Sequence, residues 1–472
     1  MQVRTDTGSV MTPSEEAAAL ASYWRRIYSK SQLAPYSWSV QHPLNITEEE
    51  LLHALLALKP RKAVSADAAP AGAWKALAPQ MSRYLCRLLQ GLWSTGLVTI
   101  PEHWTTSDLH FLTKPGKLAR RVQDLRPIAL QSPAAKVVTT VLRDRIRPYI
   151  RQALGSVPQY AFAAHRSTIE AINRVAAHCS EVRTILRAQT LTVHARYNGA
   201  TRSDCIGGAQ ISIDLSKAFD MMPRSLLQFI LLDAGVPADE AHLIVLWHQQ
   251  GRYRIVDRSG GPDHAVALDQ GVRQGCVLSP SLWALFTCYL ARRLDDCNGL
   301  GWTAQHGTLF ADDMHFSWLI SAPSDLDGLR QDIRRIYVVL GEMGMQANPD
   351  KSTLLLGLRG YKAAKWCRRY FRKDCKGGRR LHFGSTLADV VPISETFTYL
   401  GVVLSYRGFE DATVRHRIGV AAGHFERLRR ILYARKVLGK MSRYRLWMIA
   451  ILTSQLYGLE AVGVTAEGCR LL

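Results

Sequence analysis

The sequence has few features of a secreted, disulfide-stabilised or membrane-spanning protein. Its nine cysteines are scattered over 472 residues without a Cys-x-x-Cys pair, which argues against a disulfide scaffold or an ordinary zinc ribbon. The N-terminal MQVRTDTGSV lacks the apolar core of a signal peptide. The longest apolar stretch, residues 447–464, contains Gln455 and Glu460, whereas a lipid span needs about 20 nearly uncharged residues. We therefore expect a soluble intracellular protein in which this stretch is a packed helix.

Acidic residues are also scarce relative to basic ones. The chain has 60 Lys and Arg against 39 Asp and Glu, a net charge of +21, which predicts a polyanionic partner such as nucleic acid or an acidic membrane surface. Residues 361–380 hold nine basic residues and one acid, and residues 412–447 hold ten and one. Most of the excess therefore lies in the C-terminal third. No Gly-x-x-x-x-Gly-Lys-Ser/Thr loop is present, so a P-loop nucleotide triphosphatase is not indicated.

The hydrophobic periodicity predicts helices and strands without an internal repeat. Thr47 and Glu50 are spaced as a capping box at the start of a helix. Further helices are expected over residues 74–92 and 137–150, and strands over residues 109–112 and 211–215. Residues 308–319 predict two short strands around a tight acidic turn, whereas residues 178–208 are hard to place and look like an insertion or a long connection.

Two acidic positions have the pattern of a metal site. Asp214 ends the apolar strand, and Asp312 and Asp313 lie in the acidic turn. Rigidly held carboxylates are costly to leave without a counter-charge, and hard oxygens suit Mg²⁺. Three aspartates can hold two metal ions about 3.5–4 Å apart for phosphoryl transfer. Alternatively, the Asp-Asp pair only decorates a surface hairpin, because Asp is common in turns.

An ordered series of motifs resembles the reverse transcriptases of non-long-terminal-repeat (LINE-like) retrotransposons. The series comprises residues 46–77 with Lys62, Ala63, Asp67 and Pro70, then 112–117, 125–130 with Lys136, 159–172, 213–220, 271–280, 310–316, 345–352 and 397–402. The resemblance covers residues 46–405. The chain departs from the family at Phe310, where tyrosine is usual, at Ala161, where glycine is frequent, in the loop 63–69 and in a longer insert at 361–392. Phe310 keeps the apolar packing, so we expect metal binding to survive.

The resemblance implies an α+β right-hand polymerase. Residues 1–100 would form a helical N-terminal extension, residues 101–405 the fingers and a palm with an antiparallel sheet, and residues 406–472 a helical thumb, which we expect to be truncated. The insert 361–392 would interrupt the palm. Its aromatic residues Tyr361, Trp366, Tyr370 and Phe371 alternate with basic ones, which suits stacking on single-stranded bases; an unstructured basic insert is the alternative.

The implied activity is RNA-directed DNA polymerisation. A primer 3′-OH would attack the α-phosphate of a deoxynucleotide with two Mg²⁺ ions, or Mn²⁺ in their place. The implied partners are an RNA template, a DNA primer, their RNA–DNA hybrid and dNTPs, without a membrane, in the nucleus. Alternatives are an inactive retroelement remnant that only binds nucleic acid, a group II intron-type or telomerase-type reverse transcriptase, and an RNA-dependent RNA polymerase.

The resemblance also assigns site residues. Catalysis and metal binding fall to Asp214, Asp312 and Asp313, with the Leu215 carbonyl as a further metal ligand. Nucleotide contacts fall to Lys114, Arg126, Phe219, Gln274, Gly275 and Lys351, with Phe219 excluding a ribose 2′-OH. Primer and template contacts fall to the hairpin Tyr399, Leu400 and Gly401 and to basic thumb residues, among them Arg417, Arg427, Arg430 and Lys436.

Structural interpretations of the same residues remain open. Lys114 and Lys351 could be solvated lysines, Arg126 a structural arginine, Phe219 a core residue and Gln274-Gly275 an ordinary turn. Tyr399 to Gly401 could be a buried strand pair and the thumb arginines, Arg417 among them, a solvated face. We expect Asp220 to cap the helix that follows it.

Overall fold

The computed structural model describes residues 3–5, 7–29, 36–94, 96–114, 116–189, 194, 197–199, 201–349, 351–374, 377–386, 389–434 and 437–472. The chain forms two compact units, each built from separate segments. Unit 1 comprises residues 1–155, 216–290 and 343–345, and unit 2 comprises residues 156–215, 291–342 and 346–472.

Unit 2 is built around a seven-stranded sheet with the order β11-β12-β13-β10-β5-β9-β8. The interior strand β5 comprises Ile206–Asp214. The other strands are β8 (Gly307–Phe310), β9 (Asp313–Ile320), β10 (Thr353–Arg359), β11 (Phe371–Lys373), β12 (Arg379–His382) and β13 (Val390–Ser394). Strand β5 pairs antiparallel with both β9 and β10. Because β5 is flanked on both edges, its apolar residues are buried; Ala209, Ile211 and Ile213 are fully inaccessible. The two strands expected over residues 308–319 are therefore present as β8 and β9.

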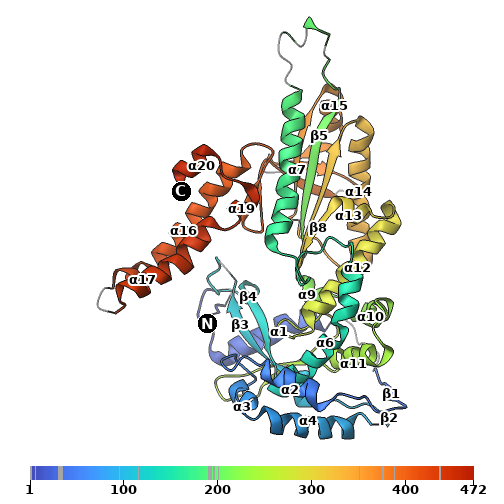
Figure 1. The fold of residues 1–472 in the computed structure, drawn as a ribbon, viewed down its shortest axis with the longest axis vertical. Helices are drawn as coiled ribbons and strands as arrows, with labels where there is room; N and C mark the ends of the chain where they lie inside the picture. Colours follow the sequence, from blue (N-terminus) through green and yellow to red (C-terminus); the bar gives the residue numbers. More distant parts are fainter. Residues whose placement is uncertain are drawn as a thin grey trace. The chain divides into compact units, whose positions relative to one another are not determined.

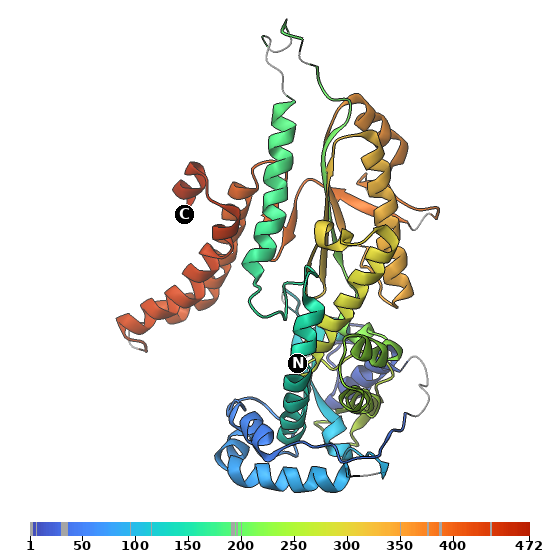
Figure 2. The same ribbon diagram turned by 45° about the vertical axis from the view of Figure 1, so that its right-hand side comes forward.

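Long helices cover this sheet. Helix α7 (Thr168–Ala188) begins at Ser167, which forms a reciprocal capping box with Glu170. It runs alongside β5 (Figure 1), and in the turned view α7 and α14 (Pro323–Glu342) flank the sheet from opposite sides (Figure 2). Unit 2 also contains α13 (Trp302–His306), α15 (Tyr361–Tyr370) and the C-terminal half of α12 (Ser279–Asn298).

The C-terminal part of unit 2 joins a small hairpin to a group of helices. The hairpin is β14 (Phe397–Tyr399) with β15 (Val402–Leu404), and α16 (Phe409–Tyr433) follows it. The remaining elements are α17 (Lys440–Trp447), the π-helical turn η3 (Met448–Leu452), α18 (Thr453–Leu456), α19 (Leu459–Val462) and α20 (Ala466–Leu471). Tyr399, Val402 and Phe409 share one apolar core with Ile172 and Val175 of α7, so the hairpin is anchored to the helix that covers the sheet.

Unit 1 contains a four-stranded sheet with the order β4-β3-β6-β7. The strands are β3 (Thr106–Thr113), β4 (Leu125–Leu130), β6 (Arg252–Ile255) and β7 (His264–Ala267). Helix α1 (Pro13–Tyr28) packs on this sheet, and Trp24 of α1 stacks on Phe111 of β3 with ring centroids 6.2 Å apart. Thr12 and Glu15 cap the start of α1 reciprocally. The N-terminal segment is therefore part of the core of unit 1.

One short strand pair and several helices complete unit 1. They are β1 (Ser39–Val40), β2 (Gly96–Leu97), α2 (Glu48–Leu56), α3 (Ala71–Ala76), α4 (Ala78–Leu92), α5 (Glu102–Thr105), η1 (Val122–Asp124), α6 (Pro133–Leu154), α9 (Ala218–Met221), η2 (Arg224–Leu226), α10 (Leu227–Asp233) and α11 (Ala238–Gln249). The expected capping box of Thr47 and Glu50 starts α2.

Three expectations about secondary structure need correction. The helix expected over residues 74–92 is two helices, α3 and α4, which meet at Leu77. Residues up to 188 of the unassigned segment 178–208 continue α7, and β5 begins at 206. Residues 447–464 form several short helices with Ile449 largely exposed, not one packed helix. Within the described residues, none of the helices has the length and apolarity to cross a membrane.

Candidate active site

The pairing of β5 with β9 brings two of the three predicted catalytic aspartates together. Asp214 is the residue directly opposite Asp313 in this antiparallel pair. Side chains of directly opposed residues lie on the same face with Cβ atoms about 4.5–5.5 Å apart. The expected convergence of the two acidic positions is therefore present in the fold of unit 2.

The third aspartate lies in the tight turn between β8 and β9. Phe310 pairs with Asp313, which leaves Ala311 and Asp312 as a two-residue turn. Ala311 has a φ of +53°, in the left-handed region that is unfavourable for a residue with a Cβ. Hairpin turns that suit the strand twist need such an angle, and glycine or asparagine usually supplies it.

Gln159 holds this strained turn through its side-chain amide. Its Oε1 accepts a hydrogen bond from the Ala311 N–H at 3.1 Å, and its Nε2 donates to the Ala311 carbonyl at 3.4 Å. The same Oε1 accepts from the Ala161 N–H at 2.9 Å, and Gln159 is fully buried. The sequence reasoning did not identify this contact. Gln159 opens the motif 159–172, but a hydrogen bond across 152 residues has no local signal.

The pKa of Asp313 reflects its burial and the repulsion among the carboxylates at the hairpin. Burial, with added repulsion from the Asp312 and Asp214 carboxylates, raises the pKa of Asp313 to about 6. Lys351 acts in the opposite direction, and its Nζ lies 3.2 Å from an Asp214 carboxylate oxygen. The structure thus places Lys351 beside a predicted metal ligand.

The segment after β5 is fixed through its backbone. The Asp214 carbonyl accepts from the Asn348 N–H at 2.7 Å, and the Asp214 N–H donates to Ser352 Oγ at 3.3 Å. Leu215 forms an isolated antiparallel bridge with Ala347. The motif 345–352 therefore supports the chain at Asp214 and Leu215.

The donor set fits a hard divalent cation, although the side chains are not closed around one. Among the described residues, no three His, Cys, Asp or Glu side chains stand close enough to form a ready metal-binding group. Asp214, Asp312 and Asp313 nevertheless supply only carboxylate oxygens, and the pKa of Asp313 is raised partly by its two neighbours. A cation held by these oxygens would offset that repulsion.

In unit 1, the predicted phosphate-binding cations lie on one hairpin. Arg126 on β4 pairs with Leu112 on β3, and its side chain is exposed. Lys114 directly follows β3, and its Nζ donates to the Gln123 carbonyl at 2.7 Å. The two cations therefore share the β3–β4 hairpin.

Gln274 and Gly275 lie against β4 of the same hairpin. Ala129 donates its N–H to the Gln274 carbonyl at 2.8 Å. Gly275 has a φ of +105°, and a Cβ there would lie 2.6 Å from the Ala129 carbonyl oxygen. The glycine is thus required for close approach to β4, and within unit 1 the structure brings Gln274 and Arg126 to neighbouring segments.

Phe219 is half-buried at the start of α9. Its ring stacks on Trp283 of α12 at a centroid distance of 5.0 Å, and its carbonyl accepts from the Val272 N–H. This packing on Trp283 fixes the position of the Phe219 ring.

Asp220 has a different environment from the one expected. Instead of capping a helix, its carboxylate is buried and accepts hydrogen bonds from the Tyr28 hydroxyl at 2.7 Å and from Gln274 Nε2 at 2.9 Å. Burial raises the pKa of Asp220 to about 6 even though both hydrogen bonds lower it. Tyr28, near the end of α1, was not singled out by the sequence.

The predicted primer-contacting hairpin is present as β14–β15. Leu400 and Gly401 form its two-residue turn with φ angles of +45° and +85°, which is the pattern of a type I′ turn. Tyr399 is buried against His315, whereas the turn residues are half-buried.

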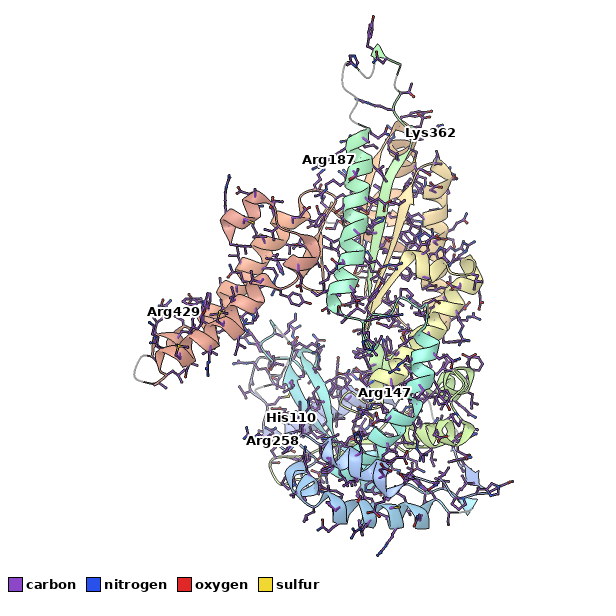
Figure 3. The ribbon with its side chains drawn as sticks, in the orientation of Figure 1. His110, Arg147, Arg187, Arg258, Lys362 and Arg429 are labelled. Carbon is purple, nitrogen blue, oxygen red and sulfur yellow. The ribbon has the colours of Figure 1, made fainter. Side chains whose placement is uncertain are left out.

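The basic thumb residues separate into exposed and buried ones. Arg427 and Arg430 are exposed on α16, and Figure 3 labels the neighbouring Arg429 on the same helix. Arg417 is only 8% exposed, donates to the Ser454 carbonyl and lies over the Tyr457 ring, so it is a structural arginine and not part of a solvated or phosphate-binding face. Lys436 lies outside the described residues.

The insert at 361–392 is folded onto the sheet. Trp366 of α15 is buried and donates to Asp327 at 3.1 Å, and Tyr370 lies beneath the Arg330 guanidinium. These two aromatics pack inward and are not positioned for base stacking, whereas Tyr361 is exposed. The insert is not unstructured, because β12 and β13 extend the palm-like sheet. Lys362, labelled in Figure 3, lies at its start.

Comparison with known proteins agrees with these features. The family described as reverse transcriptase (RNA-dependent DNA polymerase) matches residues 112–404, and the chain belongs to this family. The match confirms the expected class, an α+β polymerase of the right-hand type.

Two mobile-element relatives place the chain near the non-LTR retrotransposons. It is 23% identical over 295 residues to the RNA-directed DNA polymerase from mobile element jockey of Drosophila funebris, covering 59% of this chain and 30% of the relative. It is 25% identical over 247 residues to the probable RNA-directed DNA polymerase from transposon BS of Drosophila melanogaster, covering 52% and 25%. The expected resemblance is confirmed, and the chain spans less than a third of either relative.

Solved telomerase structures are more distant. Apo telomerase from Candida tropicalis aligns with a TM-score of 0.42 and 12% identity over 82% of this chain and 63% of that chain. A form truncated from its C-terminal domain gives 0.41 and 12% over 65% and 54%.

Proposed function

We propose that the chain is an RNA-directed DNA polymerase of a non-LTR retrotransposon, which joins a dNTP to a primer 3′-OH and releases pyrophosphate. The observation that carries this proposal is the direct pairing of Asp214 with Asp313, next to Asp312 in the β8–β9 turn. The end of β5 and the β8–β9 turn thus supply three carboxylates from two separate motifs. Such a set of carboxylate oxygens suits nucleotidyl transfer with two divalent cations.

Asp214, Asp312, Asp313 and the Leu215 carbonyl would hold two Mg²⁺ ions, with Mn²⁺ as a substitute. Bound metal would stabilise charge on the attacking and leaving oxygens. The chain itself holds the carboxylates in place through the β5–β9 register, the Gln159 amide and the backbone contacts of Asp214. Lys351 partly neutralises Asp214 and would contact the nucleotide phosphates.

The remaining proposed contacts are with nucleotide and nucleic acid. Lys114 and Arg126 would bind the triphosphate as fixed cations, Phe219 would exclude a ribose 2′-OH, and Gln274 with Gly275 would line the nucleotide position. Tyr399, Leu400 and Gly401 would contact the primer. Arg427, Arg430 and Lys436 would contact the phosphates of an RNA–DNA hybrid, so affinity should fall steeply with salt.

We also propose a division into domains and a location in the cell. The division into an extension (1–100), fingers and palm (101–405) and thumb (406–472) would assign the sheet of unit 2 to the palm and α16 to the thumb. Because its relatives are mobile-element polymerases, the chain would act in the nucleus, where an RNA copy can be converted into DNA beside its target.

Primer extension on poly(rA)/oligo(dT) with dTTP and Mg²⁺ tests the proposed activity. The full chain should incorporate nucleotide, Asp312→Asn should not, and Asp296→Asn, which changes an exposed aspartate on α12, should match the unaltered chain. Equal incorporation by the unaltered chain and Asp312→Asn would exclude the carboxylate assignment. No incorporation by the unaltered chain would favour a remnant that only binds nucleic acid.

A separate substitution tests the sugar gate. Phe219→Val should allow ribonucleotide incorporation, because the smaller side chain leaves room for a 2′-OH. An unchanged preference for deoxynucleotides would leave Phe219 with a packing role on Trp283 only.

A further inference from the structure

Helix α1, which precedes the family-matched region, docks on the segment that leads to Gln274. Arg25 Nη2 donates to the Ala265 carbonyl at 3.1 Å, and Ser29 Oγ donates to the Ala267 carbonyl at 3.0 Å. The Asp269 N–H donates to the Tyr28 carbonyl at 3.1 Å. The end of α1 is therefore fixed along residues 265–269, shortly before Gln274.

The Tyr28 side chain continues this contact into the interior. Its hydroxyl donates to Asp220 Oδ1 at 2.7 Å, and both oxygens of Asp220 accept from Gln274 Nε2 at 2.9 Å. Tyr28 and Asp220 are 1% and 3% exposed, whereas Gln274 is only half-buried. A buried pair thus ends on a side chain that solvent and ligands can reach.

We infer that Tyr28 and Asp220 are positioning residues that fix the orientation of the Gln274 side-chain amide for nucleotide recognition. This inference rests on the proposed polymerase function. An ionised carboxylate accepts hydrogen bonds and cannot donate them. The NH₂ end of the Gln274 amide must therefore face Asp220, and its carbonyl oxygen must point away as an acceptor.

A buried carboxylate is an expensive way to hold an amide if stability alone is needed. Burial raises the pKa of Asp220, which shows that the surroundings disfavour its charge. The Tyr28 hydroxyl and the Gln274 amide offset part of that cost through hydrogen bonds to the charged form. Asp220 in turn gives Gln274 one defined orientation, which a neutral hydroxyl or water, able both to donate and to accept, would not.

Steady-state incorporation of dTTP by the full chain tests this role in three variants. Tyr28→Phe removes one hydroxyl and should raise the KM for dTTP about 3- to 10-fold, the change expected for one lost hydrogen bond. Asp220→Asn should raise KM further, because it removes the charge and leaves only one of the two oxygens that accept from Gln274 Nε2. The kcat should change less than KM in both. Tyr23→Phe is the matched control: it removes a hydroxyl from the same helix while its ring stays under Lys217 Nζ, 5.1 Å away.

The decisive comparison uses the Gln274→Ala background. If Tyr28 acts through Gln274, Tyr28→Phe should have no further effect on KM once the amide is absent. Additive effects of Tyr28→Phe and Gln274→Ala on KM would overturn the inference, and so would equal KM values for Tyr28→Phe and Tyr23→Phe.

A measurement that needs no activity separates this inference from the proposed function. The thermal unfolding midpoints of Tyr28→Phe, Gln274→Met and the double variant should be non-additive, because both side chains bind the same carboxylate. Additive midpoints would overturn the inference even if the polymerase is active. Non-additive midpoints in a chain that incorporates no nucleotide would support the coupled arrangement while contradicting the proposed function.

Discussion

Asp313 in unit 2 and Asp220 in unit 1 have pKa values raised to about 6 for different reasons. At Asp313, burial is reinforced by two neighbouring carboxylates, and Lys351 provides the opposing charge. At Asp220, burial alone raises the pKa, and it is opposed mainly by the hydrogen bonds from Tyr28 and Gln274, with smaller contributions from the charges of Lys217 and Lys114. A raised pKa therefore does not by itself distinguish a metal ligand from a positioning carboxylate.

The neighbours of each carboxylate make that distinction. A cation would relieve the repulsion among Asp214, Asp312 and Asp313, whereas the Asp220 carboxylate already accepts hydrogen bonds from Tyr28 and Gln274. We expect added divalent metal to lower the pKa of Asp313 and to leave the pKa of Asp220 unchanged.

The largest expected effect is on kcat, and it should distinguish Asp313 from Asp220 when each is replaced by asparagine. Asp313→Asn should lower kcat by at least about 100-fold, the size typical of losing a group that stabilises transition-state charge. Asp220→Asn should keep most of kcat and act on KM. Single-turnover and steady-state incorporation measure both. Loss of kcat in both variants to the same extent would contradict the distinction between the two carboxylates.

A second prediction concerns how the hairpin carrying Asp312 and Asp313 is held. Gln159→Met removes the amide contacts with Ala311 but keeps the side-chain length. Losing hydrogen bonds worth about 1–3 kcal/mol would raise the activation free energy by up to that amount, which lowers kcat about 5- to 160-fold. Ala311→Gly in the same chain should restore part of it, because glycine adopts a φ of +53° without a Cβ penalty.

The comparison between the single and the double variant decides this prediction. If Gln159→Met unfolds the chain nonspecifically, Ala311→Gly has no reason to restore kcat. The control is Gln331→Met on α14, which makes the same chemical change away from the hairpin and should leave kcat unchanged.

The acidic hairpin and its closeness to Asp214 could be predicted from the sequence and its motifs, but the strand register and the polar contacts behind the hairpin could not. Alternating apolar residues around Asp312-Asp313 predict a hairpin, and its pairing with the apolar strand before Asp214 follows from the ordered motifs. Gln159 and Tyr28 bind partners 152 and 192 residues away. No periodicity or motif spacing encodes a hydrogen bond over that separation.

For the aromatic residues of the insert, the sequence pattern predicted a surface that the structure does not have. Their alternation with Lys and Arg indicated a nucleic-acid surface, but Trp366 and Tyr370 are four residues apart and pack together on one face of α15 with ring centroids 5.2 Å apart. Helical spacing was the better signal there. Arg417 was misassigned for a similar reason, because charge counting along α16 does not reveal which face is buried.

A third prediction uses pH and metal together. Both aspartates bind protons more tightly in the folded chain than the unfolded reference of 3.8, so the folded state carries more protons between about pH 4 and 6. Their contribution to stability is therefore present at low pH and is lost as pH rises through about 6. Saturating Mg²⁺ should remove the contribution of Asp313 only. Urea unfolding at pH 4.5 to 7.5, compared with Asp220→Asn and Asp313→Asn, measures each part. If Mg²⁺ also abolishes the pH dependence contributed by Asp220, the prediction that only Asp313 responds to metal is wrong.

The smallest expected effect concerns Lys351. Its side chain is 66% exposed, so loss of its ion pair with Asp214 in Lys351→Met should change the free energy of unfolding by less than about 1 kcal/mol. The same substitution should raise the pKa of Asp313 further, because Lys351 is the cation that lowers it. Carboxyl-carbon NMR titration of the metal-free chain should therefore show an upward shift at Asp313 and none at Asp220. A shift at both aspartates would mean that the two carboxylates share an electrostatic environment, and the contrast between a metal-binding and a positioning carboxylate would then lose its physical basis.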